Sequence, residues 1–165
     1  MAMTLVSTVT VGSGGAASIE FTGIAGTGKD LVLLFSTRSD TSGDNLRLRL
    51  NGDTGTNYTR INLRGSGAAA SSVTGTQDFA FIGQQPETTH TANTFGNGLV
   101  YLSNYTSTTN KSFSGDVVSE QNATTAWQIL TAGSYSTSLA ITSLTLFPVS
   151  GNFVQHSTAS LYIIS

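Results

Sequence analysis

The sequence predicts an all-β protein: a single-domain antiparallel β-sandwich, jelly-roll-like, with about ten short strands. Three observations predict this fold. Short apolar runs alternate with polar residues at period 2, glycine-rich turns separate the runs, and no segment has the apolar spacing of an amphipathic helix. The 165 residues have the length of one domain, and no internal repeat of fixed period divides them.

The first part of the chain predicts three strands. Leu5–Val11 alternates and ends at a glycine-rich turn, so residues 1–15 form an N-terminal arm that joins its own sandwich or a neighbour's. Ala17–Phe21 is the second predicted strand. Asp30–Ser36 is apolar on both faces, which indicates a strand in the centre of a sheet.

Residues 46–63, LRLRLNGDTGTNYTRINL, predict a β-hairpin. Leucines and arginines alternate in the first half, Asn51-Gly52 lets the chain reverse, and Tyr58–Leu63 alternates again. We expect the leucine face of this hairpin in the core of the sandwich. The opposite, polar face would carry Arg47, Arg49 and Arg60.

The second part of the chain predicts the remaining strands. They are Phe79–Ile82, Leu99–Leu102, Ser112–Ser119, Ala126–Thr131, Ser138–Phe147 and Ala159–Ile164. Turns are predicted at Thr106–Lys111, Glu120–Ala123, Gly133-Ser134 and Pro148–Asn152. Gly65–Thr76 contains small residues without periodicity, which favours a flexible surface loop over a contact that accepts close backbone approach.

The composition excludes several classes of partner. Only 10% of the residues are charged, against about 25% in an average soluble protein. A net charge of −2 gives no electrostatic footprint for nucleic acid or an anionic membrane. The absence of cysteine excludes disulfides and thiolate chemistry and suits assembly in a cytosol. We expect a soluble protein with no signal peptide and no membrane helix.

No catalytic, cofactor or metal site is predicted. Gly23–Asp30 has the spacing of a phosphate-binding loop, but Asp30 stands where a hydroxyl should hold magnesium, so we expect a turn between strands. His90 and His156 lack zinc-ligand spacing. Glu and Asp residues share no glycosidase motif, and no nucleophile motif appears. Three aspartates lie in predicted turns: Asp40, Asp44 and Asp53. Their spacing matches no calcium-binding loop, although a calcium site at these turns remains an open alternative.

Basic residues are scarce and concentrated. Four of the seven lie within residues 47–64, where three of them alternate onto one surface. This pattern is either a solvated face with acidic partners or a protein-contact patch. The candidates for protein contact are Arg47, Arg49, Arg60, Arg64 and Tyr58.

Two stretches, LRLRLNGDTGTNYTRINLRGSG and Ala140–Ile164, resemble small structural proteins of tailed bacteriophages. Thr91–Gln128, with its strands and Thr/Asn-rich loops, fits the same pattern. The resemblance covers much of residues 19–164 and lies in texture and order, without a catalytic motif. It implies a non-enzymatic virion protein, assembled in the host cytoplasm.

Within that resemblance, the first hypothesis is a capsid decoration (cement) protein. Such a protein would sit on the capsid surface, often as a homotrimer, over junctions between subunits of the major capsid protein. The alternative is a tail fibre or receptor-binding module that recognises a host glycan with loop aromatics. A sugar-cleaving enzyme on a jelly roll is the third hypothesis.

Overall fold

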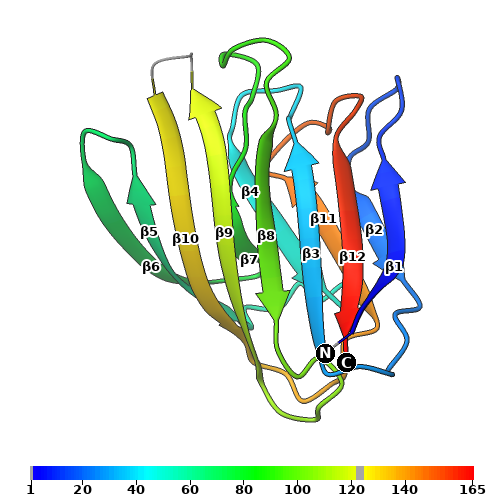
Figure 1. The fold of residues 1–165 in the computed structure, drawn as a ribbon. Coiled ribbons are helices and arrows are strands. Elements are labelled where there is room, and N and C mark those ends of the chain that lie inside the picture. Colours follow the sequence, from blue (N-terminus) through cyan, green and yellow to red (C-terminus); the bar gives the residue numbers. More distant parts are fainter. Residues whose placement is uncertain (1, 122–124) are drawn as a thin grey trace.

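The computed structural model describes residues 2–121 and 125–165, which form a β-sandwich of two antiparallel sheets (Figure 1). The strands are β1 (Met3–Thr10), β2 (Ile19–Thr22), β3 (Asp30–Thr37), β4 (Asn45–Leu50), β5 (Tyr58–Gly65), β6 (Ala70–Gln77), β7 (Ala80–Gln84), β8 (Gly96–Leu102), β9 (Lys111–Gln121), β10 (Thr125–Tyr135), β11 (Ser143–Pro148) and β12 (Thr158–Ile164). The larger sheet has the order β1-β12-β3-β8-β9-β10-β5-β6, and the smaller sheet has the order β2-β11-β4-β7. The predicted all-β sandwich is confirmed.

The core lies between the two sheets, where alternate residues of each strand point inward. Leu46, Leu48 and Leu50 of β4 are fully buried, as predicted, and face inward residues such as Leu31 and Leu33 of β3. Each buried leucine stabilises the fold by about 1.5–3 kcal/mol relative to an exposed one. The leucine alternation therefore fixes which face of β4 points outward.

The hairpin predicted for residues 46–63 is wrong. β4 pairs with β11 and β7 in the smaller sheet, whereas β5 pairs with β10 and β6 in the larger one. Asn51 and Gly52 do turn the chain, both with positive φ. The Asn51 side chain, however, donates to the carbonyl of Ala140 (2.8 Å) and accepts from the amide of Thr142 (2.8 Å). The turn is thereby anchored to the loop before β11, and residues 51–57 carry the chain across to the other sheet.

The flexible loop predicted for Gly65–Thr76 is also wrong, because most of it is β6. This strand pairs with β5 over eight residues without a register shift. The turn predicted at Gly133-Ser134 lies inside β10 instead. A side chain at Gly133 would collide with the ring of Phe113 and the carbonyl of Thr59, so this glycine permits close packing. Of the turn predicted at Glu120–Ala123, Glu120 and Gln121 belong to β9, and residues 122 and 123 lie outside the described residues.

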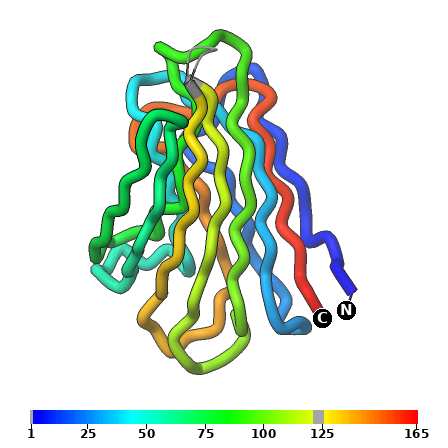
Figure 2. The backbone as a smooth tube through the Cα atoms, turned by 60° about the vertical axis from the view of Figure 1, so that its left-hand side comes forward, coloured from blue at the N-terminus to red at the C-terminus, as the bar shows by residue number. Residues whose placement is uncertain are grey.

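The N-terminal strand joins its own sandwich. β1 pairs antiparallel with β12, with a register shift between Leu5 and Ser7. The two ends of the chain lie side by side (Figure 2), and the backbones of Ala2 and Ser165 exchange two hydrogen bonds of 3.1 and 3.0 Å. Residues 2–15 are thus part of the single sandwich in this chain.

The Gly23–Asp30 segment is a connection between β2 and β3, as the sequence predicts. Tyr105 holds it: the amide of Gly28 donates to the Tyr105 hydroxyl at 3.2 Å, and that hydroxyl donates to the carbonyl of Ala25. A side chain at Gly28 would collide with Ile163. Close packing explains the glycine, and no helix follows the loop to bind an anion.

The larger sheet extends beyond the smaller one. β7 forms one edge of the smaller sheet, yet all five of its residues are buried, because β9, β10 and β5 pack over it. β5 and β6 then continue past this edge, as the left side of Figure 1 shows. This extension brings the inward face of β5 over the outer side of β7.

Candidate functional site

Three arginine side chains lie in a row on the outer side of the smaller sheet, and each guanidinium group covers a phenylalanine ring. The distance from guanidinium carbon to ring centre is 4.1 Å for Arg47 on Phe79, 4.8 Å for Arg49 on Phe147 and 4.3 Å for Arg60 on Phe81. These distances are within the range of cation–π contacts. We call the six side chains the arginine–phenylalanine stripe; its members are Arg47, Arg49, Arg60, Phe79, Phe81 and Phe147.

The strand register builds most of the stripe. Because the leucines of β4 point into the core, Arg47 and Arg49 point outward. Phe147 of β11 and Phe81 of β7 stand directly opposite Arg47 in the two neighbouring strands. Residues opposite each other in antiparallel strands share a face, so these phenylalanines also lie on the outer side of the sheet.

Arg60 enters the stripe from the other sheet. It points inward on β5, and the extension of the larger sheet places that side over Phe81. The structure therefore brings the predicted arginines Arg47, Arg49 and Arg60 together, but through the packing of two sheets and not through a hairpin.

The stripe carries more positive than negative charge. Among the described residues its one ion pair joins Nη2 of Arg49 to Oδ2 of Asp78 at 3.5 Å, and the Asp78 side chain is 49% exposed, so the pair is weak. Burial lowers the pKa of Arg47 and of Arg60; Asp78 partly offsets this effect at Arg47, and the charge of Arg47 adds to it at Arg60. Arginine remains protonated at neutral pH, so the stripe holds three cations against one carboxylate.

These guanidinium groups also have donor capacity left over. The Nε atoms of Arg47, Arg49 and Arg60 are buried and have no hydrogen-bond acceptor among the described residues. A guanidinium group has five N–H donors in a planar fork that matches a carboxylate. Because these Nε atoms are buried, an acidic group placed against the stripe would meet the exposed part of each half-buried guanidinium group and supply the missing negative charge there.

Arg64 lies on the same inward side of β5 but at its far end, where its guanidinium carbon is 4.2 Å from the centre of the Trp127 ring. Four residues of extended strand separate it from Arg60 by about 13 Å. Arg64 is therefore stacked like the other three arginines, but it lies outside the stripe.

Tyr58 was predicted as a contact residue, and this prediction is wrong. The side chain is fully buried and stacks on Tyr135 with ring centres 4.7 Å apart. Its hydroxyl donates to the carbonyl of Leu50 (3.2 Å) and accepts from the amide of Leu50 (3.0 Å), and burial raises its pKa. Through these hydrogen bonds Tyr58 anchors the connection between the two sheets, residues 51–57, to the end of β4.

Two other cations have internal roles. Arg38 is buried and donates to the backbone carbonyls of the 87–94 segment, with distances of 2.7 Å to Glu87 and 2.8 Å to Thr91. Lys111 is also buried and donates to the carbonyls of Ser107, Thr109 and Leu139 at 2.6–2.7 Å. These side chains hold loops, unlike the arginines of the stripe.

The aspartates considered for calcium lie in separate turns. Asp40 accepts from the amide of Asn152 (2.7 Å), Asp53 accepts from the amide of Gly55 (2.7 Å), and Asp44 accepts from the Gln84 side chain. His90 lies 3.5 Å from Glu87, and His156 occupies a turn with positive φ. In the described part of the chain, no three His, Asp or Glu side chains converge as a metal site requires.

Sequence reasoning missed the phenylalanines of the stripe. Phe79 and Phe81 alternate with small and aliphatic residues around β7, and Phe147 follows the leucines of β11. Their positions in period-2 patterns were a usable signal, since an aromatic residue on the outer side of a strand next to an arginine is a candidate for stacking. What was missing was the pairing of these strands with β4.

Comparison with known proteins adds no assignment. No known protein family matches the chain, and no curated protein matches it significantly.

Proposed function

We propose that this chain is a non-enzymatic structural protein of a phage virion, a decoration (cement) protein that binds and stabilises the shell of the major capsid protein. The resemblance described above suggests the class. The observation that carries the proposal is the arginine–phenylalanine stripe on the outer side of a sheet. Its three stacked guanidinium groups have one carboxylate, that of Asp78, as counter-charge.

The connectivity supports a jelly-roll scaffold for this role. If the hairpins β5–β6 and β9–β10 are treated as insertions, four strands in the order β1-β12-β3-β8 face four in the order β2-β11-β4-β7. Successive strands then cross between the sheets, except β4 and β7, which pair within the smaller sheet, and this order supports a jelly roll with two Greek keys. Such a scaffold presents the outer sides of both sheets to partners.

The stripe suits a protein interface. Arginine and aromatic residues are enriched in the energetically dominant part of interfaces. Stacking holds the flat guanidinium groups in place before binding, so less conformational entropy is lost when a partner binds. Their N–H edges would receive carboxylates of the capsid protein, and a partner that binds only the assembled shell stabilises it by mass action.

The copy number of the chain in purified virions tests the proposal. A decoration protein is present in numbers comparable to the capsid subunits, and particles that lack it lose resistance to heat. Quantitative mass spectrometry of virions measures this ratio. A few copies confined to the tail would contradict the proposal and support the receptor-binding module that recognises a host glycan. Virions without the chain would contradict both.

A further inference from the structure

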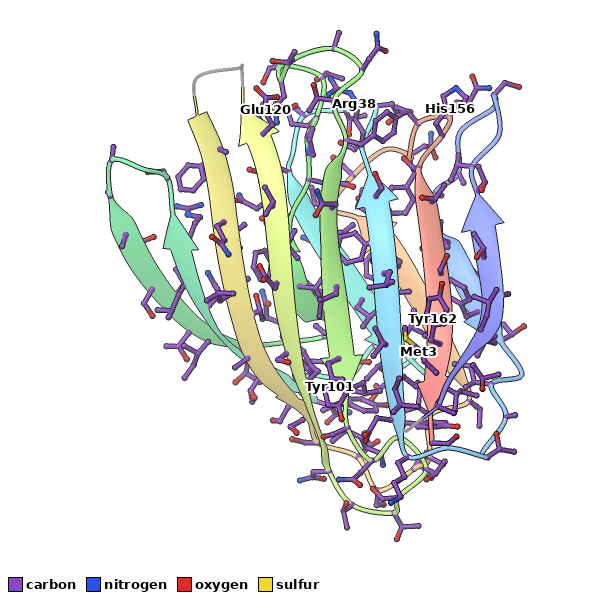
Figure 3. The ribbon with its side chains drawn as sticks, viewed as in Figure 1. Met3, Arg38, Tyr101, Glu120, His156 and Tyr162 are labelled. Carbon is purple, nitrogen blue, oxygen red and sulfur yellow. The ribbon has the colours of Figure 1, made fainter. Side chains whose placement is uncertain are left out.

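The outer face of the eight-stranded sheet is a second surface with a different chemistry. In Figure 1 this face is turned toward the reader, and Tyr101 and Tyr162, labelled in Figure 3, belong to strands in it. The registers place five side chains side by side across the middle of the sheet. In order from β3 to β5, they are Leu34, Leu99, Asp116, Leu130 and Leu63.

This face carries exposed apolar side chains among uncharged polar ones and is nearly free of charge. The four leucines of the middle row are between 38% and 55% exposed. The rows directly above and below add Val118, Tyr101 and Ile61, so this face holds most of the exposed large apolar side chains of the described chain. In these three rows Asp116 is the one charged side chain, and its Oδ1 accepts from Gln128 at 3.4 Å.

The face has the size of a protein interface. Eight strands about 4.8 Å apart and three rows about 7 Å apart cover roughly 800 Å². A stable interface buries about 800 Å² on each partner. The whole face is therefore large enough for one specific contact.

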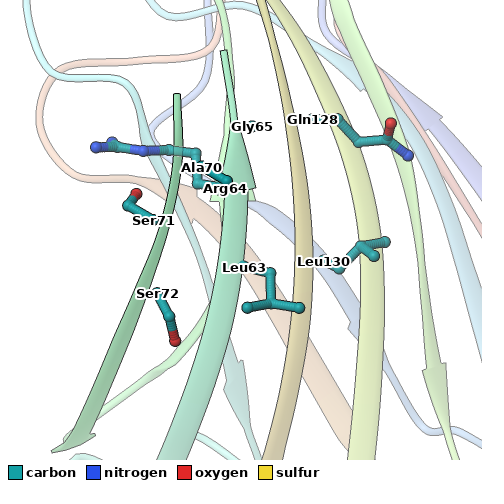
Figure 4. A pocket seen from close by; sticks show the side chains of 8 residues that line it. All are labelled: Leu63, Arg64, Gly65, Ala70, Ser71, Ser72, Gln128 and Leu130. Atoms are coloured by element: carbon teal, nitrogen blue, oxygen red, sulfur yellow. The ribbon is translucent and has the colours of Figure 1, made fainter. Parts of the chain in front are cut away.

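The surface of this face is hollowed beside its most exposed leucines. Gly65, Ala70 and Ser72 leave a shallow hollow next to Leu63 and Leu130, and Arg64 also lines it (Figure 4). An apolar side chain from a partner would fill this hollow and cover both leucines. Next to it, β6 ends the sheet as a regular strand of eight uncharged residues without proline, an edge that lacks the usual protection against pairing.

We propose that the occupant of this face is a second copy of the same chain. The two outer sides of the sandwich differ in charge, so they suit two different kinds of partner. The arginine–phenylalanine stripe requires a partner with carboxylates, whereas the three middle rows of the larger sheet's outer face hold one charge, Asp116, and a cation, Arg64, only beside the hollow, so a strongly charged partner would gain little there. Another copy brings an equally large face with Asp116 as the one charge of its middle rows, and the exposed leucines of both copies are buried together. This proposal does not depend on the virion function.

Sedimentation equilibrium of the purified full chain tests this proposal. The wild type should form an oligomer of defined stoichiometry, and the double variant Leu99→Asp/Leu130→Asp, which places charge on both sides of Asp116, should weaken self-association at least about 30-fold. Both leucines are exposed, so the variant should retain the wild-type circular dichroism spectrum. Arg47→Ala/Arg49→Ala, on the opposite side of the sandwich, is the control and should associate like the wild type.

Three results would overturn the proposal. A wild type that stays monomeric at every concentration has no self-contact. An oligomer unaffected by the double variant uses another surface. A monomer whose Leu99→Asp/Leu130→Asp variant no longer enters particles uses this face for a different protein.

Discussion

Arg60 of the larger sheet places its guanidinium carbon 4.3 Å from the ring centre of Phe81, a residue of the smaller sheet. Phe81 in turn stands opposite Arg47 in the strand register. This contact across the two sheets is what joins Arg60 to the arginines of β4. The stripe is therefore sensitive to how β5 is docked as well as to its own residues.

Phe81→Ala should destabilise the protein by about 3–5 kcal/mol, because it removes a buried ring and leaves a cavity under Arg60. Phe81→Leu, which keeps most of the volume, should cost less than about 1.5 kcal/mol. Chemical denaturation measures both free energies of unfolding. Equal effects of the two variants would mean that the ring does not pack as described.

Tyr58→Phe should lower the free energy of unfolding by about 1–2 kcal/mol, because the hydroxyl exchanges two hydrogen bonds with the backbone of Leu50. The same variant has a consequence for pH. Burial raises the pKa of Tyr58 and of Tyr135 in the folded state, whereas an unfolded tyrosine titrates near about 10. The folded state thus favours the neutral hydroxyls.

Stability should therefore be retained below about pH 10 and fall as the pH rises further, since the unfolded chain loses these protons first. Denaturation at a series of alkaline pH values measures the slope, which should be shallower for Tyr58→Phe than for the wild type. Identical slopes would show that Tyr58 does not contribute.

Gly133→Ala should destabilise the protein by about 1–3 kcal/mol, because the new methyl group meets Phe113 and the carbonyl of Thr59. Gly12→Ala is the matched control, since nothing lies within 4 Å of its methyl group. Thermal unfolding of the two variants gives the comparison. A stable Gly133→Ala protein would contradict the packing of β10 against β5 and β9.

Much of the fold follows from local patterns in the sequence. The errors arise where such a pattern does not show which other strand a strand pairs with. The leucines of β4 predicted a buried face correctly because alternation reports burial. The same pattern could not say that β4 pairs with β11, since the Asn51 side chain selects residues about 90 positions away. β6 was missed because small residues give no periodic signal, and its register with β5 is what orders it.

For the candidate site, too, the sequence predicted one part and missed another. The concentration of arginines in residues 47–60 was visible in the sequence, and the structure does bring these side chains together. The sequence marked Tyr58 as a contact residue as well, but its side chain is buried in the core. The phenylalanines come from residues 79–81 and 147, which no local pattern links to β4.

Salt should distinguish the two proposed surfaces. Raising the ionic strength from about 0.05 to 0.5 M screens charges, so binding of the stripe to an acidic partner should weaken. Self-association through the outer face of the larger sheet should persist or strengthen, because burial of apolar surface is not screened. Pull-down on particles and sedimentation at both salt concentrations measure the two effects. Parallel responses to salt would contradict this division of roles.

The most direct test of the central claim is the binding of Arg47→Ala/Arg49→Ala protein to phage particles that lack the chain. Lys29→Ala, which removes an exposed cation outside the stripe, is the control. We expect the double variant to keep the wild-type fold and to lose most of its binding, while Lys29→Ala binds normally. Normal incorporation of the double variant would contradict the account and reduce the stripe to a structural element of the sheet.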